Sequence, residues 1–321
     1  MKLYEIENEY IKAKVCDYGA TLQSLYIKSF KTDVVLGFNQ LSKYKDEGKY
    51  FGQTIGRISN RIQGGKFTFN NIDYQLELND NNINNLHSGD SGLHTKYFKV
   101  IQEETKISCY YTLQDKEEGL PGILDIIVIY EIIDNRLKIT MKGIAQTNTL
   151  CSLTNHSYFN LKGTNTIEDH NLWIDANSFG ELDNTGVTLD NQIDVTNTPF
   201  DFREPKLIKP SLDSDHPQIL SAKGLDHNYC LNNNGYNCKA ILTYLNREMK
   251  VYTNMNNMHV YSGNYFENQI GKQEEIYKPR AAIAFETQEY PNAINYNKDK
   301  KPLLNKDEVY ENIVTLEFNN L

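Results

Sequence analysis

The sequence lacks the features that mark nucleic-acid-binding and membrane proteins. Its 321 residues contain no Lys/Arg-rich run and carry a formal net charge of −9, so no site for nucleic-acid phosphates is predicted. No segment reaches the roughly 20 apolar residues that span a bilayer, and the charged opening MKLYEIENEYIKAK has no apolar centre like that of a signal peptide. We therefore expect a soluble, cytoplasmic protein that binds neither nucleic acid nor membrane.

Cysteine is also scarce, and its positions follow neither a disulfide nor a zinc pattern. The count is odd, no CxxC spacing occurs and no secretory signal accompanies them, so we expect buried thiols. The five are Cys16, Cys109, Cys151, Cys230 and Cys238. GxGxxG and GxxxxGK[ST] elements are absent as well, so neither a dinucleotide site nor a P-loop phosphate site is indicated.

The seven histidines do not predict a metal site. His87 and His94 are seven positions apart, which is not the i, i+4 spacing of HExxH on a helix. Asp226 and His227 are adjacent, and adjacent residues on a strand point to opposite faces. No Cys/His cluster compensates for this spacing, so we expect no bound metal.

Tyrosine is frequent by contrast. The chain has 22 Tyr, 13 Phe and one Trp, so many aromatic faces carry a hydroxyl that can hydrogen-bond at a wet boundary. This composition favours β structure and suits a polar ligand. A tyrosine-rich sheet that faces solvent explains the same count.

Alternating apolar and polar residues predict β-strands along most of the chain. The clearest hairpin joins residues 66–69 to 72–78 through Asn70 and Asn71, because Asn tolerates the positive φ angles of a tight turn. Further strand patterns cover residues 13–15, 21–27, 106–113, 123–133, 137–144, 239–244, 249–253, 259–262, 281–286 and 313–318. Many short strands predict an all-β protein, a sandwich or a barrel.

The length allows two average domains or one large all-β domain. After Gly163 the chain is rich in Asn and Asp, and residues 177–197 read as loops, which is where a boundary would fall. Strand patterns resume beyond it without a linker composition, so we predict a single domain over residues 1–321. Few windows sustain a helical period, and residues 41–46 and 200–204 are expected as single helical turns.

The stretch AAIAFETQEYPNAIN, residues 281–295, carries the first candidate for chemistry. On a strand, Ala282, Ala284 and Glu286 point to one face, and the strand is expected to end at Glu286. Gln, Tyr and a Pro-Asn turn follow at once. A carboxylate at the mouth of a strand, beside aromatic and amide groups, suits a sugar-binding catalytic site, whereas a rim Glu facing water is the ordinary alternative.

Two histidines lie in settings that suit acid–base work. His156 lies in LTNHSYFNLKG, among amide and aromatic side chains, where its pKa depends on its partner. A core histidine that is hydrogen-bonded for structure fits that motif equally well. His87 lies in NNLHSGDSG, where glycines let a loop present its ring in a cleft.

Charged residues near two further turns could bind a polar ligand. Arg57 and Arg61 flank Asn60 in GRISNRIQ, and two guanidinium groups can clamp sugar hydroxyls or an anion, although a surface salt-bridge patch has the same composition. Asp226 lies at a Gly-containing turn in GLDHNYCL, where it is either a solvent-exposed carboxylate or an acceptor for sugar hydroxyls.

Several of these motifs occur together in one order. They are GRISNRIQGGKFTFNNIDYQL, NNLHSGDSG, NHSYFNL, FDFR, GLDHNY, VYSGN and AFETQEYPNAIN, from about residue 50 to residue 295. In this the sequence resembles the aldose 1-epimerase (galactose mutarotase) family over nearly the whole chain. The resemblance implies one large β-sandwich, a monomer or homodimer, and an enzyme that interconverts the α and β anomers of a free hexose such as galactose or glucose.

The resemblance also implies roles for individual residues. Glu286 matches the family's general base and His156 its general acid. The positions that contact substrate match Asn60, Arg61, His87 and Asp226, with His87 also near the ring oxygen. Two residues depart from the family pattern: His259 stands where many members have Gln, so the way it holds a sugar hydroxyl is open, and Ser88 replaces Gly.

Anomer exchange itself requires a base at the C1 hydroxyl and an acid at the ring oxygen, and no cofactor. Three other functions remain compatible with the sequence. Epimerisation of a hexose 6-phosphate needs additional cations, and only six arginines are present. A sugar-binding protein without activity can share the fold. A glycoside hydrolase needs a second carboxylate, for which Asp226 and Glu289 are the candidates.

Overall fold

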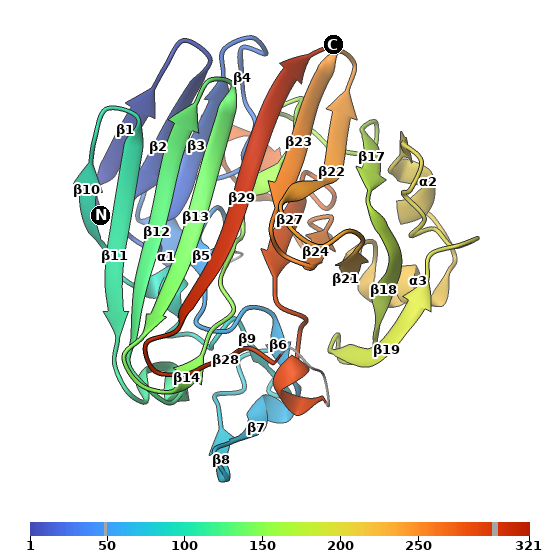
Figure 1. The fold of residues 1–321 in the computed structure, drawn as a ribbon. Helices are drawn as coiled ribbons and strands as arrows, with labels where there is room; N and C mark the ends of the chain where they lie inside the picture. The colour runs from blue at the N-terminus through green and yellow to red at the C-terminus, as the bar shows by residue number, and fades with distance from the viewer. Residues whose placement is uncertain (48–49, 297–300) are drawn as a thin grey trace.

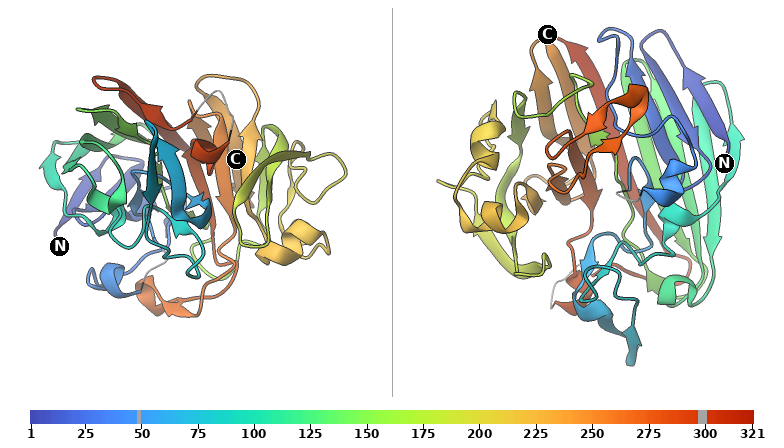
Figure 2. Two further views of the ribbon diagram at one scale, coloured as in Figure 1. Left: turned by 90° about the horizontal axis from the view of Figure 1, so that it is seen from below. Right: turned by 180° about the vertical axis from the view of Figure 1, so that it is seen from behind.

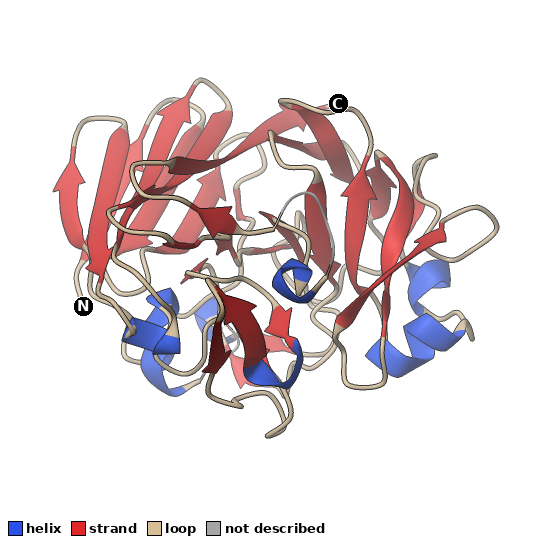
Figure 3. Cartoon of the chain, turned by 60° about the horizontal axis from the view of Figure 1, so that its bottom comes forward, coloured by secondary structure: helices blue, strands red, loops and turns tan. Residues whose placement is uncertain are grey.

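Strands make up most of the chain, and the helices are few and short (Figure 3). The computed structural model describes residues 1–47, 50–296 and 301–321. Within these ranges the largest sheet has nine strands, and two others have six and four. Figure 1 shows the large sheet running across the molecule from β10 to β17, and Figure 2 shows it from below and from behind.

The nine-stranded sheet has the order β10 (Lys99–Gln102), β11 (Lys106–Leu113), β12 (Leu124–Ile133), β13 (Arg136–Ala145), β29 (Val309–Asn320), β23 (Arg247–Thr253), β22 (Asn237–Tyr244), β17 (Asn171–Ile174) and β20 (Lys206–Leu207). The six-stranded sheet has the order β16 (Tyr158–Phe159), β27 (Ile283–Gln288), β24 (Asn257–Tyr261), β21 (Asp226–Leu231), β18 (Ala176–Leu182) and β19 (Thr188–Asp194). The four-stranded sheet contains β1 (Leu3–Glu7), β2 (Ile11–Cys16), β3 (Thr21–Ile27) and β4 (Thr32–Asp33).

Short two-stranded pairs and single turns complete the described elements. The pairs are β5 (Thr54–Ile55) with β15 (Thr154–Asn155), β6 (Arg61–Ile62) with β9 (Asn85–Leu86), β7 (Lys66–Phe69) with β8 (Ile72–Gln75), β14 (Thr149–Leu150) with β28 (Leu303–Leu304) and β25 (Gln269–Ile270) with β26 (Ile276–Tyr277). The α-helices are α1 (Lys43–Asp46), α2 (Lys209–Leu212) and α3 (Pro217–Ala222), and the 3₁₀ turns are η1 (Gln63–Gly65), η2 (Leu93–Thr95), η3 (Glu117–Gly119), η4 (Lys272–Glu274) and η5 (Ala293–Asn295).

The strand pattern of the sequence is followed closely in the large sheet. In β12, Leu124, Ile126, Val128, Tyr130 and Ile132 are buried, while the residues between them are only partly covered. This period of two gives the strand one core-facing side. All ten residues of β12 pair with β13 in an unbroken antiparallel register.

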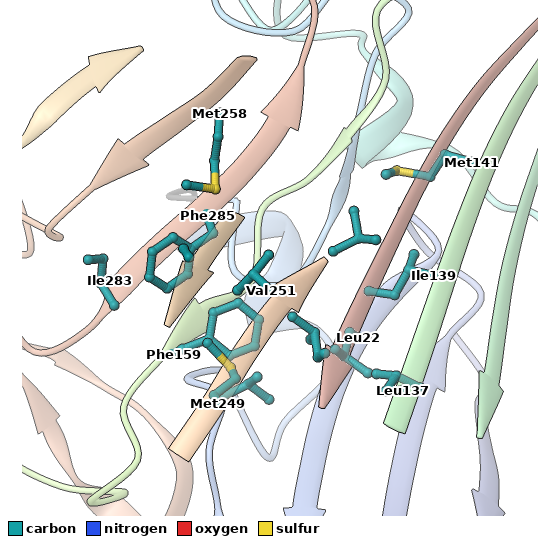
Figure 4. Close-up of a cluster of buried hydrophobic side chains, with 14 of the residues drawn as sticks. Leu22, Leu137, Ile139, Met141, Phe159, Met249, Val251, Met258, Ile283 and Phe285 are labelled. Carbon is teal, nitrogen blue, oxygen red and sulfur yellow. The ribbon is translucent and has the colours of Figure 1, made fainter. Parts of the chain in front are cut away.

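One hydrophobic core joins the three sheets, which defines the architecture as a β-sandwich. Figure 4 shows side chains from β3, β13, β23, β24 and β27 in one cluster with Phe159. The labelled residues are Leu22, Leu137, Ile139, Met141, Phe159, Met249, Val251, Met258, Ile283 and Phe285. The core therefore lies between the nine-stranded sheet and the two smaller ones.

Two local predictions need correction. Residues 41–46 do contain α1, but residues 200–204 are not helical: Phe202 O accepts the Ile174 backbone N–H and Arg203 O accepts Trp173 Nε1–H, which holds the segment alongside β17. The region 177–197 was expected as loops, yet it contains β18 and β19. β19 is a largely exposed edge strand, so its sequence carries no apolar alternation.

The hairpin of β7 and β8 is confirmed, with Asn70 and Asn71 at positive φ between the two strands. The cysteines are free thiols, of which Cys16, Cys109 and Cys151 are buried and the other two partly buried. In the described part of the chain, no helix combines the length and the apolarity that a membrane crossing requires.

Arg57 is an internal brace and not the ligand-binding residue that the sequence suggested. Its side chain is fully buried and donates hydrogen bonds to the carbonyl oxygens of Pro121 and Gly122, each at 2.8 Å. Its Nε lies 3.5 Å from Oε2 of Glu118, whose pKa burial raises to about 8. The guanidinium therefore ties the chain before β6 to the turn around η3.

Replacing Arg57 by methionine will lower the free energy of unfolding by roughly 3–5 kcal/mol, because buried carbonyl groups and Glu118 lose their partner. Urea denaturation of the two proteins measures this difference. Arg136→Met is the matched control: its side chain is 51% exposed and pairs with Glu317 at 2.6 Å, so a change of about 0–1 kcal/mol is expected. Equal losses of unfolding free energy in the two variants would show that Arg57 stabilises the fold no more than an exposed ion pair does.

Candidate active site

A single cavity of about 920 Å³ brings the sequence-predicted site residues together. Asn60, Arg61, His87, His156, Asp226, His259 and Glu286 all line it. Arg57 and Glu289 do not contribute to its described lining. The rest of the wall is mostly tyrosine, amide and carboxylate side chains, so the cavity combines hydrogen-bonding groups with aromatic surface.

The six-stranded sheet positions the residues at the cavity floor. Glu286 on β27 and His259 on β24 are directly paired in the antiparallel register, so their side chains lie next to each other on one face. The alternate residues Phe285 and Val260 point to the core. β27 runs to Gln288, two residues beyond the predicted end, because the pairing with β24 continues to Asn257.

Four site residues follow one another across this sheet. His156 lies between β15 and β16, Glu286 on β27, His259 on β24 and Asp226 at the start of β21. These strands are neighbours in the order β16, β27, β24, β21. The floor is therefore a row of side chains in the order His156, Glu286, His259, Asp226.

His156 and Glu286 form a buried contact pair. His156 Nε2 lies 3.4 Å from Glu286 Oε1, and each side chain is at most 4% exposed. Burial raises the pKa of Glu286 well above its usual range and lowers the pKa of His156 to about 3. Among the described residues, Glu286 Oε2 and His156 Nδ1 have no hydrogen-bond partner. The pair thus offers a carboxyl and an imidazole with unused hydrogen-bonding capacity to a polar ligand.

The tautomer of His87 is fixed by its surroundings. The backbone N–H of Asn60 donates to the ring nitrogen Nδ1 of His87 at 3.1 Å, and the backbone N–H of His87 donates to the backbone carbonyl oxygen of Asn60 at the same distance. In the neutral ring the proton must then be on Nε2, so His87 presents a donor. His87 and Asn60 both have positive φ, a conformation that costs energy and often marks functional sites.

A tyrosine packs over the imidazoles. The Tyr50 ring is stacked on His156 with centroids 5.7 Å apart, and its ring contacts His87 and His94 edge-on at 4.7 and 5.0 Å. The ring of Tyr158 also contacts His156, with centroids 4.7 Å apart. These rings cover His156 from solvent, which is the physical cause of its lowered pKa.

Arg61 is held in place by a carboxylate and a glycine. Its Nε donates to Asp80 Oδ2 at 2.7 Å. Gly186, at φ +85°, packs so closely that a Cβ there would lie 3.1 Å from the Arg61 guanidinium carbon. The turn between β18 and β19 therefore closes over Arg61 and leaves its charge directed at the cavity.

Asp226 and His259 form a second contact pair, with Oδ1 and Nε2 2.7 Å apart. Although burial opposes ionisation, the hydrogen bond from His259 lowers the pKa of Asp226 to about 2. Asp226 is therefore a carboxylate at neutral pH. Because a carboxylate only accepts hydrogen bonds, His259 Nε2 is the donor in this pair.

Comparison with known proteins agrees with this arrangement. The family model described as aldose 1-epimerase matches residues 2–317. The chain belongs to the aldose 1-epimerase family. The galactose mutarotase of Sus scrofa is 31% identical over 324 residues, covering 98% of this chain and 93% of the relative.

Solved structures of aldose 1-epimerases confirm the galactose mutarotase-like fold. An aldose epimerase homologue from C. elegans superimposes with a TM-score of 0.93 at 28% identity, covering 100% of this chain and 99% of that one. Galactose 1-epimerase from Lactobacillus acidophilus gives a TM-score of 0.87 at 29% identity, with coverage of 98% and 93%.

Three groups of this aldose 1-epimerase-family chain come close enough to be considered as metal ligands. One ligand atom from each of His87, His156 and Glu286 lies within 4.8 Å of the others. A metal needs a ring nitrogen with a free lone pair, and its other ring nitrogen normally donates a hydrogen bond. His87 has the opposite arrangement, since Nδ1 already accepts the Asn60 N–H and Nε2 then carries the proton. The donor set does not fit a metal, and no step is assigned to one.

Several residues of the site carry no sequence signal. Tyr50, Asp80 and Gly186 line the cavity from segments that resemble ordinary polar loops. Their contribution depends on contacts between distant parts of the chain. Ser88 accepts the Ile58 backbone N–H through Oγ at 2.9 Å and lies at positive φ. Its hydroxyl therefore fastens the loop that carries His87.

Proposed function

We propose that this protein is an aldose 1-epimerase that interconverts the α and β anomers of free hexoses such as galactose and glucose in hexose metabolism. The observation that supports this most directly is the contact of Glu286 with His156 in a polar cavity. Anomer exchange needs one group that accepts a proton from the C1 hydroxyl and one that donates a proton to the ring oxygen. Both oxygens are bonded to C1. No cofactor enters the scheme.

The proton balance of the pair suits this reaction. Glu286 takes the proton of the C1 hydroxyl while His156 gives a proton to the ring oxygen, and the bond between C1 and the ring oxygen breaks. The open aldehyde rotates about the C1–C2 bond and closes on its other face, and each proton returns to its origin. The pair carries one proton in total throughout, so the cycle neither consumes nor releases protons.

In the absence of sugar, burial favours the neutral forms of both groups, with the proton on Glu286 and none added to His156. Transfer of the Glu286 proton to His156, across 3.4 Å, produces the carboxylate and imidazolium that the reaction uses without any change in net charge. A sugar hydroxyl donating to Glu286 Oε2 stabilises the carboxylate, because that atom lacks a partner among the described residues. Substrate binding thus favours the productive protonation state.

The surrounding residues would orient the sugar. His87 presents an N–H donor close to His156, with ring centroids 5.6 Å apart, where it can stabilise charge that develops on the ring oxygen. Arg61, Asp226 and Asn60 line the same cavity and supply donors and acceptors for the remaining hydroxyls. Together they would bind a free hexose through its hydroxyls.

The charges of the cavity disfavour a phosphorylated substrate. The described lining contains Lys45 and Arg61 as cations, against the carboxyl groups of Asp80, Asp90, Asp226, Glu267 and Glu286. Arg61 is already paired with Asp80. A phosphate would meet more negative than positive charge, so we expect hexose 6-phosphates to be poorer substrates than free hexoses.

Polarimetry tests the proposal. Freshly dissolved α-D-glucose and α-D-galactose should relax to their ordinary final rotation faster with the protein than without it. A folded protein that binds the sugar without accelerating relaxation would point to a binding function instead. Acceleration confined to a hexose 6-phosphate, or hydrolysis of an aryl glycoside, would point to the other two enzyme classes.

The pH dependence of kcat/KM should show no inflection near pH 6.5. A second proton can enter the pair only at His156, whose pKa is lowered to about 3, and burial also holds the pKa of His87 well below its usual range. Activity is therefore kept as pH falls from 7.5 to 5.5 and lost only towards the pKa of His156. Rates must be corrected for uncatalysed mutarotation at each pH. An inflection of kcat/KM at pH 6.5 would contradict this assignment.

A further inference from the structure

We propose that Asn312 is a positioning residue, which holds Glu286 and His156 at the distance that their proton transfer requires. This inference rests on the proposed anomer exchange and adds to it a residue that lies outside the cavity. Asn312 belongs to β29 in the nine-stranded sheet, whereas Glu286 lies on β27 in the six-stranded sheet. Asn312 is not part of the described cavity lining. Its effect on the reaction must therefore pass through the segments that it contacts.

Asn312 interrupts an otherwise apolar face of β29. Val314, Leu316 and Phe318 follow it at intervals of two, and all three belong to the hydrophobic core. Asn312 itself is 0% exposed. Burying an amide costs free energy unless its hydrogen bonds are satisfied, and an apolar side chain would avoid that cost. The role of Asn312 is therefore to be found in its hydrogen-bond partners.

The amide bridges two other segments of the chain. Its Nδ2 donates to the backbone oxygen of Thr287 at 2.7 Å and to that of Leu153 at 2.9 Å. The hydroxyl of Thr287 donates to Oδ1 of the same amide at 3.0 Å. This third hydrogen bond fixes which end of the amide faces the two carbonyl groups. All the groups involved are buried, so solvent does not compete for them.

The two segments are those that carry the acid and the base. Thr287 directly follows Glu286 on β27. Leu153 precedes His156 by three residues, and the short strand β15 lies between them. The bridge through Asn312 thus sets how far the backbone before His156 lies from the backbone at Glu286. Across this gap His156 Nε2 lies 3.4 Å from Glu286 Oε1.

This separation matters because proton transfer depends steeply on geometry. Misplacing a reacting group by about 1 Å can lower a rate by about 10². Without the amide, the two segments stay joined by a longer hydrogen bond, from the Glu289 backbone N–H to Ser152 Oγ at 3.3 Å. Loss of the Asn312 side chain should therefore loosen the pair without separating the two sheets.

Polarimetry of α-D-galactose with Asn312→Leu tests the inference. Leucine keeps the approximate size of the side chain but removes all three hydrogen bonds. We expect kcat to fall about 10- to 100-fold while KM changes by less than about threefold, because the side chains that would bind the sugar stay in place. Rates are compared at a temperature at which urea denaturation shows each protein to be folded.

Asn264→Leu is the matched control, because its amide makes the same set of hydrogen bonds as Asn312. Nδ2 of Asn264 donates to the backbone oxygens of Ala222 and Leu225, each at 2.9 Å, and Oδ1 accepts the Ser262 hydroxyl at 2.5 Å. These bonds fasten the turn before β21 and do not reach the acid–base pair. We expect a similar loss of unfolding free energy, with kcat within about threefold of wild type.

A second readout separates positioning from a general weakening of the fold. In a His156→Ala background, Asn312→Leu should lower kcat by less than about threefold, because no imidazole remains to be positioned. Should Asn312→Leu fail to fold, Thr287→Val takes its place, since it removes only the hydroxyl that orients the amide. We expect that variant to lose kcat by about 3- to 10-fold, and again not in the His156→Ala background.

The outcomes separate this inference from the function on which it rests. Equal losses of kcat in the wild-type and His156→Ala backgrounds would overturn the positioning role, as would an unchanged kcat in Asn312→Leu. Either result leaves the acceleration of galactose relaxation by the wild-type protein intact. If the wild-type protein accelerates the relaxation of neither sugar, the proposed function itself fails and the role of Asn312 fails with it.

Discussion

Replacing Glu286 by glutamine will remove most of the acceleration of anomer exchange, by a factor of about 10² to 10⁴. Glutamine keeps the size and the hydrogen-bonding oxygen of the side chain, but it cannot take a proton from the C1 hydroxyl. Because Glu286 is buried on β27 and flanked by His259 in register, the exchange does not alter the backbone pairing. Polarimetry gives the rate, and calorimetry shows that sugar binding is retained.

Glu289→Gln is the matched control for this variant. It makes the same chemical change three residues along the chain, at a side chain that does not line the cavity. Activity close to wild type is expected there. A Glu286→Gln enzyme as fast as the control would remove Glu286 from the mechanism and leave the identity of the base to another cavity carboxylate.

Replacing His156 by alanine will lower the rate by a similar factor of about 10² to 10⁴, because the departing ring oxygen loses its proton donor. The substitution also leaves a space beside Tyr50 and Tyr158, whose rings both contact the imidazole. Added imidazole should enter this space and restore part of the rate. The same addition should do nothing for Glu286→Gln.

The rate losses caused by Glu286→Gln and His156→Ala should not be additive. If Glu286 and His156 act as one proton-transfer unit, the double variant will be about as slow as the slower single variant. Losses that multiply would show that each residue acts alone. An unchanged rate in His156→Ala would assign the acid role elsewhere, with His87 as the next candidate because the centroids of its ring and the His156 ring are 5.6 Å apart.

The sequence predicted the fold and the site to different extents, for physical reasons. The six central strands of the large sheet, from β11 to β22, were predicted because burial of one face produces an apolar period of two, as in β12. The outer strands β10, β17 and β20 of the same sheet were not predicted. β19 was not predicted as a strand, because an exposed edge strand has no apolar face. The one-domain organisation stays a prediction, which a single cooperative unfolding transition would support.

The site residues were found through collinear motifs, and their proximity was not visible in any one of them. Arg57 and Arg61 looked equivalent, and only the structure separates an internal brace from a cavity side chain. Tyr50 and Gly186 contribute through contacts with distant segments, for which a single sequence holds no local pattern. The tautomers of His87 and His259 likewise depend on partners far along the chain.

The last strand of the chain has a consequence for how the protein is made. β29 lies in the middle of the nine-stranded sheet and pairs with β13 on one side and β23 on the other. On β29, Asn312 Nδ2 donates to the backbone carbonyls of Leu153 and Thr287. Thr287 directly follows Glu286 in the chain. During synthesis the two halves of the large sheet can join only once β29 has left the ribosome. A nascent chain that has not yet extruded β29 therefore lacks both this join and the Asn312 hydrogen bond to the residue after Glu286.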